Sequence, residues 1–383
     1  MSDVLLSAAS GALRWSVADV VIDPWPAGSL AGPAPGGIRR FASMPGYFSE
    51  RRCEQGRKRR MNRKAPETAC AEPVVTCDEL AYYLGPLHRH FGHAVVESST
   101  RLWFYRQARH LSAPGEHLPV VMLPPAAGPD QLQSFVARDL ADWQRSLLEL
   151  YGVSPEALHF VRDPVRYRRL IVPAQAWLWG ERPTRKTAAA ASPPRALHPL
   201  PAGAPYGQTS TAQRVYLVRG PELFWRGAVA GESVIREFFK AHGYRLLDPV
   251  SLPLPGQLAA VRGASHVFGV QGSALHLFNL AGHDEVQVGC LGRLGVEASR
   301  RFAHSLEPFV GRFLLQPPDG ADPPADPARS ATKFRLALHQ DVARLLAFLT
   351  AFDPGLQPDR FDRQAYLQAV SADRQRFRQG AAA

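Results

Sequence analysis

The chain has 383 residues, of which 45% are hydrophobic and 21% are charged, and its formal net charge is +11. These values are typical of a soluble globular protein, and the length is sufficient for two ordinary domains with separate cores. No apolar run approaches the ~20 residues of a transmembrane helix. The start Met1-Ser-Asp-Val-Leu-Leu lacks the basic region of a secretory signal, so we expect a cytoplasmic protein.

The first 75 residues are rich in Pro, Gly and Arg, and we expect them to be irregular, with one apolar segment at 17–22. Residues 51–64 carry eight Lys or Arg against one Glu, Glu54. Such a run repels itself and stays extended, and it attracts an anionic membrane leaflet or another polyanion. Because no aromatic residues alternate with it, we expect no nucleic-acid partner. Attachment to the inner face of the membrane and a solvated linker without a partner both remain open.

The four cysteines are Cys53, Cys70, Cys77 and Cys290. They form no CxxC pair and have no metal-ligand spacing, so free thiols in a reducing compartment are the expected state.

Regular patterning begins near residue 76 and predicts a first α/β domain over 76–180. A helix is expected over 87–106, after the Gly85-Pro86 break, and a short strand over 119–123. An amphipathic helix is expected from Asp130 to Leu148, and a strand over 167–173. Residues 181–212 are Pro-, Ala- and Thr-rich without periodicity, which predicts a linker or disordered loop.

A second domain is expected over 213–330. Its pattern predicts strands at 214–218, 267–270 and 285–288, with helices from Glu232 and over 256–262 between the first two strands. The alternation of strands and helices predicts a parallel sheet with helices on both faces. In residues 331–383, an apolar helix over 334–352 and a polar helix after Asp362 are expected to pack back on a domain.

The strand at 267–270 stops at Gln271-Gly272-Ser273, where we expect the chain to turn straight into a helix. A glycine turn leaves backbone N–H groups uncovered, and a helix dipole behind them favours a phosphate. An ordinary strand–turn–helix junction is the alternative. The chain has neither GxGxxG nor GxxxxGK[ST], which argues against dinucleotide redox chemistry and P-loop hydrolysis.

Five short motifs follow one another along residues 80–290. They are Phe91-Gly92-His93 with Glu97 and Arg101-Leu102-Trp103; Leu170-Ile171-Val172-Pro173; Arg219, Arg226 and Glu232; Val250-Ser251-Leu252 with Gln257; and Ala264 to Ala274. Together they resemble glycosyltransferase family 61, which includes bacterial transferases of the capsular-polysaccharide type. The resemblance implies two Rossmann-like domains facing each other across a cleft, the GT-B arrangement. The second domain would hold a nucleotide-sugar donor and the first a glycan or lipid-linked glycan acceptor.

The motifs also suggest roles for individual residues. His93 and Glu97 are one helical turn apart, so an imidazole base could be oriented by the carboxylate, or the carboxylate could itself be the base. A structural cluster in which Glu97 pairs with Arg101 is the alternative. Because no convincing DxD pair is present, we expect no metal ion. Arg219 and Arg226 would then clamp the donor phosphate, with the amides of Gly272 and Ser273.

Three further candidates are less specific. The resemblance suggests that Glu232 binds ribose or sugar hydroxyls, although a helix start is a sufficient structural reason for a carboxylate. Gln257 is a candidate hydrogen-bonding residue near the donor. Gln271 stands where the family has His, and it can donate a hydrogen bond but cannot carry a proton.

The function expected from this resemblance is a metal-independent, inverting glycosyltransferase that assembles a surface or capsular polysaccharide and uses no cofactor. The alternative is a relative that binds a glycan or nucleotide without turnover. Gln271 motivates this alternative, as does Gly231 at a position where the family has Asn.

Overall fold

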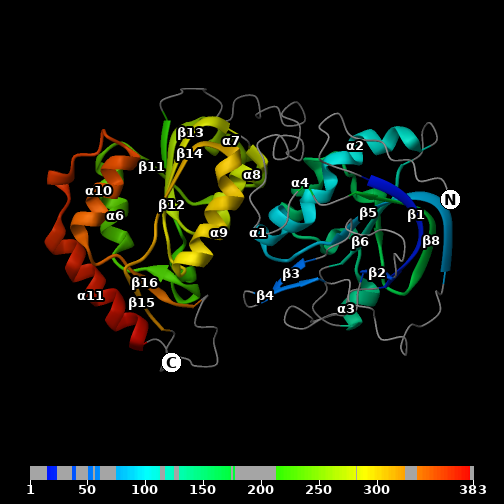
Figure 1. Cartoon of the computed structure of the whole chain (residues 1–383), viewed down its shortest axis with the longest axis horizontal. Coiled ribbons are helices and arrows are strands. Elements are labelled where there is room, and N and C mark those ends of the chain that lie inside the picture. Colours follow the sequence, from blue (N-terminus) through cyan, green and yellow to red (C-terminus); the bar gives the residue numbers. More distant parts are fainter. Residues whose placement is uncertain are drawn as a thin grey trace. The chain divides into compact units, whose positions relative to one another are not determined.

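The computed structural model describes residues 15–23, 37–39, 51–54, 57–60, 75–112, 117–124, 129–173, 176, 213–281, 283–323 and 334–379. The chain divides into two compact units, Met1–His198 (unit 1) and Pro199–Ala383 (unit 2) (Figure 1). Both units combine helices with a sheet that contains parallel strands, so the fold class is mixed α/β. The linker predicted at 181–212 lies outside the described residues.

The main sheet of unit 1 has four neighbouring parallel strands and an antiparallel edge. Its order is β2 (Gly37–Arg39), β1 (Trp15–Asp23), β8 (Val165–Pro173), β5 (Val75–Pro86), β6 (Val120–Leu123) and β7 (Leu158–Phe160). Strands β8, β5, β6 and β7 are parallel, whereas β1 runs antiparallel to β8 and β2 to β1. From β5 the chain continues to β6 and β7 on one side, and β8 then lies on the other side of β5.

The expectation that residues 1–75 are irregular is wrong for the strands described there. The apolar segment at 17–22 belongs to β1, whose Val20 and Ile22 are buried in a core cluster with Val165 and Tyr167 of β8. The basic run was expected to stay extended, but its described part folds back on itself. Within it, β3 (Arg51–Glu54) and β4 (Arg57–Arg60) pair antiparallel as a hairpin.

The regular helix expected over 87–106 is replaced by short helical segments. These are α1 (Phe91–His93), the π-helical η1 (Ala94–Ser98), the 3₁₀ helix η2 (Ser99–Phe104), α2 (Tyr105–Ala108) and η3 (Arg109–Leu111). Side-chain hydroxyls bond main-chain carbonyls at this break: Ser98 to Pro86, Ser99 to Val95 and Thr100 to Glu97, at 2.7–2.8 Å. The bonds of Ser99 and Thr100 engage carbonyls one turn back, and such bonds disfavour a regular helical ladder.

The long amphipathic helix expected from Asp130 is interrupted as well. The structure has α3 (Pro129–Ser134), η4 (Ala137–Asp139), α4 (Asp142–Glu149) and η5 (Pro155–Ala157). Asp139 accepts a hydrogen bond from the Val136 amide at 2.8 Å, and Gln144 accepts one from the Ala141 amide at 2.9 Å. Each side chain satisfies an amide at the start of a new helical turn, so helices begin where an unbroken one was expected.

The predicted parallel sheet of unit 2 is confirmed. Its order is β11 (Arg245–Leu247), β9 (Gln213–Leu217), β12 (Ala264–Val270), β13 (His283–Leu291) and β14 (Val310–Gln316). All neighbouring pairs are parallel. The predicted strands correspond to β9, β12 and β13, whereas the outer strands β11 and β14 were not predicted. The chain goes from β9 to β11 on one side and then to β12 on the other side of β9.

Helices cover both faces of this sheet, as predicted (Figure 1). One face carries α6 (Glu232–Ala241), α10 (Val342–Phe352) and α11 (Arg363–Gln379), and the other carries α7 (Leu254–Arg262), α8 (Leu277–Ala281) and α9 (Val296–Leu306). Residues from α6, α10 and α11 share a buried cluster with Tyr216 and Phe268 of the sheet. The C-terminal helices therefore pack on the sheet of their own unit.

The apolar helix expected over 334–352 begins only at Val342. Residues Leu336–Leu338 form β16, which pairs with β10 (Ala228–Val229) and β15 (Gly320–Asp322) in a small second sheet. Asp341 caps α10 by accepting a hydrogen bond from the Arg344 amide at 2.9 Å, which fixes the later start. The remaining short segments are η7 (Pro221–Arg226), η8 (Pro249–Ser251), η9 (Ser273–His276), η10 (Glu307–Phe309) and η11 (Pro358–Arg360).

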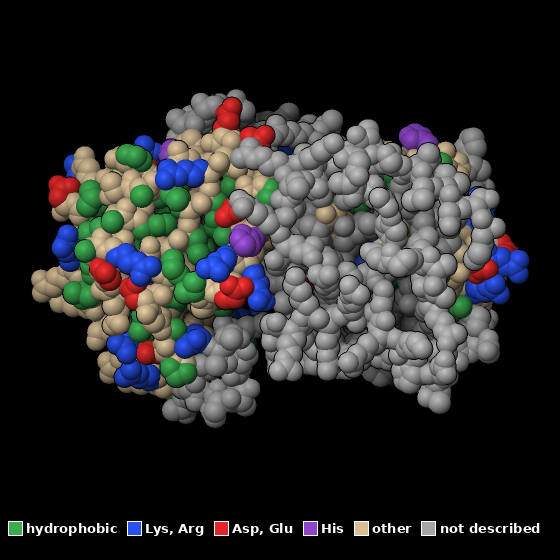
Figure 2. All heavy atoms as spheres, viewed as in Figure 1, with side chains coloured by type: hydrophobic (Ala, Val, Ile, Leu, Met, Phe, Trp, Pro, Cys, Tyr) green, Lys and Arg blue, Asp and Glu red, His purple; other side chains and the backbone are tan. Residues whose placement is uncertain are grey.

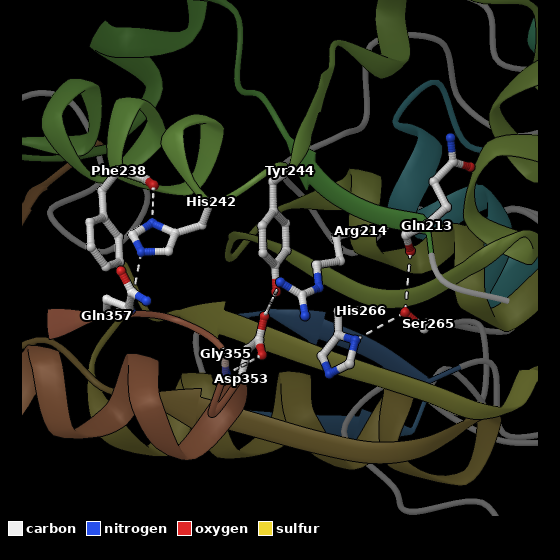
Figure 3. A network of polar contacts seen from close by, with 10 residues as sticks. All are labelled: Gln213, Arg214, Phe238, His242, Tyr244, Ser265, His266, Asp353, Gly355 and Gln357. Atoms are coloured by element: carbon white, nitrogen blue, oxygen red, sulfur yellow. Dashed lines mark hydrogen bonds and ion pairs between the residues drawn. The ribbon is translucent and has the colours of Figure 1, made fainter. Parts of the chain in front are cut away.

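A polar network lies at the amino-terminal edge of the main sheet of unit 2. It joins the segment after α10 to β9, the first strand of that sheet (Figure 3). The Tyr244 hydroxyl donates to the buried carboxylate of Asp353 at 2.7 Å, and Arg214 lies 3.5 Å from the same oxygen. The Gly355 amide donates to the other oxygen at 2.8 Å. Nearby, His242 donates to the Phe238 carbonyl and accepts from the Gln357 amide.

The surface of unit 2 carries charges of both signs. On the face shown in Figure 2, basic and acidic side chains are interspersed with hydrophobic ones over its described part. The net positive charge of the chain is therefore not gathered into one basic patch on that described surface. Among the helices that the structure describes, none is long and apolar enough to cross a membrane.

Candidate functional site

The carboxyl-terminal edge of the unit 2 sheet carries the candidate donor site. Arg219 follows β9, Gln271 and Gly272 follow β12, and Arg293 follows β13. In open α/β sheets, ligands bind at this edge where the strand order reverses, which in unit 2 is between β9 and β12. The strand order of the sheet therefore brings together residues that are far apart in the sequence.

Two guanidinium groups converge on one carbonyl at this edge. Arg219 Nη2 donates to the Arg226 carbonyl at 3.2 Å, and Arg293 Nη1 donates to the same oxygen at 3.5 Å. Arg293 Nε also donates to the Gln271 carbonyl at 2.8 Å. Burial, and then the nearby charge of Arg219, lower the pKa of Arg293 to about 10. Arg293 is still protonated at neutral pH, and an arginine side chain keeps its charge in proteins, so positive charge is concentrated here.

Gly272 allows Arg219 to approach the turn after β12. A Cβ atom at Gly272 would lie 3.2 Å from Arg219 Nη1, closer than most such contacts. The backbone of Gly272 is extended, with φ −176° and ψ 174°, so close approach and not an unusual conformation requires glycine. The chain turns directly into a helix after Gly272, as predicted, first as the 3₁₀ helix η9 and then as the five-residue α8. Because these helices are short, the arginine side chains are the main source of positive charge at this turn.

Gln271 is 1% exposed and binds the segment between β13 and α9. Its Oε1 accepts hydrogen bonds from the amides of Arg293 and Leu294, at 3.0 and 3.1 Å, and from the Ser299 hydroxyl at 3.0 Å. Its Nε2 has no hydrogen-bond partner among the described residues. The side chain thus fixes the position of the Arg293 backbone, a role that its identity alone did not reveal.

Glu232 is the first residue of α6 and lies close to the same edge. The Tyr216 hydroxyl donates to its Oε1 at 3.3 Å. The preceding Gly231 has φ +74°, and its amide donates to Asp373 of α11 at 2.8 Å. Burial raises the pKa of Glu232 to about 7, although the charge of Arg219 opposes this rise. Glu232 therefore changes its protonation state near neutral pH.

The other candidates of unit 2 have more local surroundings. The side chain of Arg226 is exposed, and it is the backbone carbonyl that the two guanidinium groups contact. Gln257 donates to the Leu252 carbonyl at 2.9 Å, which ties α7 to the loop before it. Ser273 is partly buried at the start of η9, directly after Gly272.

In unit 1, the side chains of His93 and Glu97 are hydrogen-bonded, His93 through Nδ1 to Oε1 of the carboxylate. His88 Nε2 lies 3.3 Å from the other oxygen. Burial would raise the pKa of Glu97, but hydrogen bonds from His88 and then His93 lower it to about 2. The carboxylate of Glu97 contacts Nδ1 of His93, a geometry in which it can orient the imidazole.

Sequence reasoning missed two residues of these clusters. Arg293 comes two residues after β13, and its place beside a predicted strand end was the available signal. His88 comes two residues after β5 and five residues before His93. Five residues is not a helical spacing, so the sequence did not indicate that both histidines contact Glu97. Strand order brings Arg293 next to Arg219, and local packing brings His88 next to Glu97.

The described residues contain no group of three or more His, Cys, Asp or Glu side chains that could hold a metal ion. Comparison of the chain with protein-family models and with curated proteins finds no match to either.

Proposed function

We propose that the chain is a glycosyltransferase that moves a sugar from a nucleotide-sugar donor to a glycan acceptor, in the assembly of a surface or capsular polysaccharide. The observation that carries the proposal is the convergence of Arg219 and Arg293 at the carboxyl-terminal edge of a parallel sheet. A guanidinium group matches the geometry of phosphate oxygens and can contact two of them. The motif resemblance supports the choice of a sugar nucleotide over other phosphorylated ligands.

In this proposal, the donor phosphates are neutralised by arginines and not by a metal ion. Arg219 and Arg293 bind the phosphate oxygens, and the amides of Gly272 and Ser273 add donors where charge develops as the nucleotide leaves. Glu232 accepts hydrogen bonds from ribose or sugar hydroxyls. Arg226 contributes its carbonyl, which holds both guanidinium groups in place.

His93 accepts the proton of the acceptor hydroxyl at its Nε2, while Glu97 keeps the Nδ1 proton in place. The acceptor oxygen forms a bond to the anomeric carbon as the bond between that carbon and the phosphate oxygen breaks. The nucleotide leaves with the electron pair, and a single displacement inverts the configuration at that carbon. The proposal includes the GT-B arrangement of two Rossmann-like domains, with the donor on unit 2 and the acceptor on unit 1.

The proposed location is the cytoplasm, with peripheral attachment to the inner face of the membrane through the basic run at 51–64. Deleting 51–64 should abolish co-sedimentation with anionic liposomes at low salt, because the basic residues supply the attraction and low salt leaves that attraction unscreened. Unchanged co-sedimentation would contradict the proposed membrane attachment. It would not bear on the proposed transferase activity.

The test of the activity is a panel of nucleotide sugars assayed for release of free nucleotide. We expect turnover with at least one donor, and losses of about 100-fold or more for Arg219→Ala and His93→Ala. Arg226→Ala is the matched control, because it keeps the backbone carbonyl, and it should lose much less. Turnover that neither Arg219→Ala nor His93→Ala affects would refute the site.

The alternative function is a glycan- or nucleotide-binding protein without turnover. The observation in its favour is Gln271, which stands where the resembled family has His and whose Oε1 holds the β13–α9 segment. Binding of nucleoside diphosphates that depends on Arg219, without nucleotide release from any donor, would favour this second function.

A further inference from the structure

Two imidazole rings contact the Glu97 carboxylate, one on each oxygen. His88 Nε2 lies 3.3 Å from Oε2, and His93 Nδ1 is hydrogen-bonded to Oε1. An ionised carboxylate only accepts hydrogen bonds, so the ring nitrogen that faces it must carry a proton. When both rings are neutral, His93 therefore keeps its lone pair on Nε2, the nitrogen needed to accept a proton.

The backbone of His88 is held from two sides. Its amide donates to Ser98 Oγ at 3.4 Å, and the Ser98 hydroxyl in turn donates to the Pro86 carbonyl at 2.7 Å. The buried side chain of Gln144, from α4, donates to the His88 carbonyl at 3.1 Å. The side chain of His88 is 21% exposed, against 39% for His93. The backbone of His88 is thus held in place, and its ring is less exposed than that of His93.

We propose that His88 is a positioning residue for His93 and acts through Glu97, an inference that rests on the proposed role of His93 as the proton acceptor. By holding Oε2, His88 prevents rotation of the carboxylate and keeps Oε1 directed at His93 Nδ1. Its hydrogen bond also keeps Glu97 ionised, so the shared proton stays on His93. The tautomer of His93 is then set by a ring that does not touch the substrate.

The first test measures the nitrogen chemical shifts of the His93 ring by NMR in the full chain, at a pH where the imidazoles are neutral. These shifts report which nitrogen carries the proton. We expect the proton on Nδ1 in the unmodified protein and a mixture of tautomers in His88→Ala. His88→Gln, whose amide can donate to Glu97, should restore the single tautomer.

A single Nδ1–H tautomer in His88→Ala, or His88→Gln behaving like His88→Ala, would overturn the proposal. Circular dichroism and thermal unfolding check that each variant is folded. If His88→Ala does not fold, His88→Leu replaces it, since Leu fills the space of the ring without a donor.

A second measurement separates this inference from the proposed function. With an active donor, His88→Ala should lower kcat by about tenfold to a hundredfold at unchanged KM, and His88→Gln should recover most of the loss. If no donor is turned over but the tautomer responds as expected, the proposed function fails and the positioning role stands. If turnover occurs but the tautomer does not respond, only the positioning role fails.

Discussion

Glu232 is a carboxylate that the folded chain holds in an unfavourable environment. Burial raises its pKa to about 7, against 4.5 in an unfolded chain, so the folded state binds the proton more tightly. Stability should therefore fall as the pH rises from about 4.5 to 7, and the penalty should persist above pH 7. A residue kept at such a cost is a candidate for function.

Replacing Glu232 by Gln should remove this penalty. Above pH 7 we expect the variant to be more stable than the unmodified protein by about 1–3 kcal/mol, and the difference should vanish below about pH 4.5. Denaturant unfolding at several pH values measures this. Glu237→Gln, on the exposed side of the same helix, is the control and should change stability by less than about 0.5 kcal/mol. A constant difference between Glu232→Gln and the unmodified protein at all pH values would contradict the explanation.

Gly272 is a residue whose importance depends on a neighbour. In Gly272→Ala, the added methyl group should displace the Arg219 guanidinium by a few tenths of an ångström. We expect pyrophosphate affinity, measured by calorimetry, to fall by about threefold to tenfold with little change in stability. Gly295→Ala is the matched control, because nothing lies within 4 Å of its added Cβ. Equal affinities for the two variants would argue against phosphate binding beside Gly272.

At the scale of elements, strands were more predictable than helices. The strands β8, β9, β12 and β13 lie where apolar runs predicted them, because a buried parallel strand is apolar on both faces. The helices expected over 87–106 and from Asp130 are each broken into short segments. Their apolar periodicity is real, but hydroxyl and carboxamide side chains satisfy local backbone groups and stop the helical ladder. The apolar periodicity of a sequence does not show whether side chains will bond the backbone in this way.

The segment after α10 is anchored to the sheet by one buried carboxylate. Asp353 accepts hydrogen bonds from Tyr244 and from the Gly355 amide, beside Arg214 (Figure 3). Asp353→Ala should lower the free energy of unfolding by about 2–4 kcal/mol, since it leaves buried donors unpaired. Denaturant unfolding measures the loss, and Asp359→Ala, an exposed residue of the same segment, is the control. A loss no larger than that of the control would show that the network is dispensable.

At the scale of the whole molecule, the chain has two compact units, and the phosphate ligand is proposed to bind unit 2. Hydrogen exchange of the full chain with and without pyrophosphate should therefore show protection at 219–227, 271–273 and 292–296. Ligand binding stabilises the amides that it contacts and the segments that open to release it. The strands β5, β6 and β8 of unit 1 should exchange at unchanged rates. Protection of these strands without protection near Arg219 would contradict the assignment.

The sequence by itself determined the α/β class, the parallel sheet of unit 2 and the proximity of His93 and Glu97. Each depends on residues close together in the chain, through alternating apolar segments or four-residue spacing. Only the tertiary structure decided that Arg293 joins Arg219 and that His88 shares the carboxylate of Glu97. Those contacts depend on which strands are neighbours and on how the broken helix after β5 packs. Neither is encoded in local periodicity, because strand order is selected by the packing of the whole sheet.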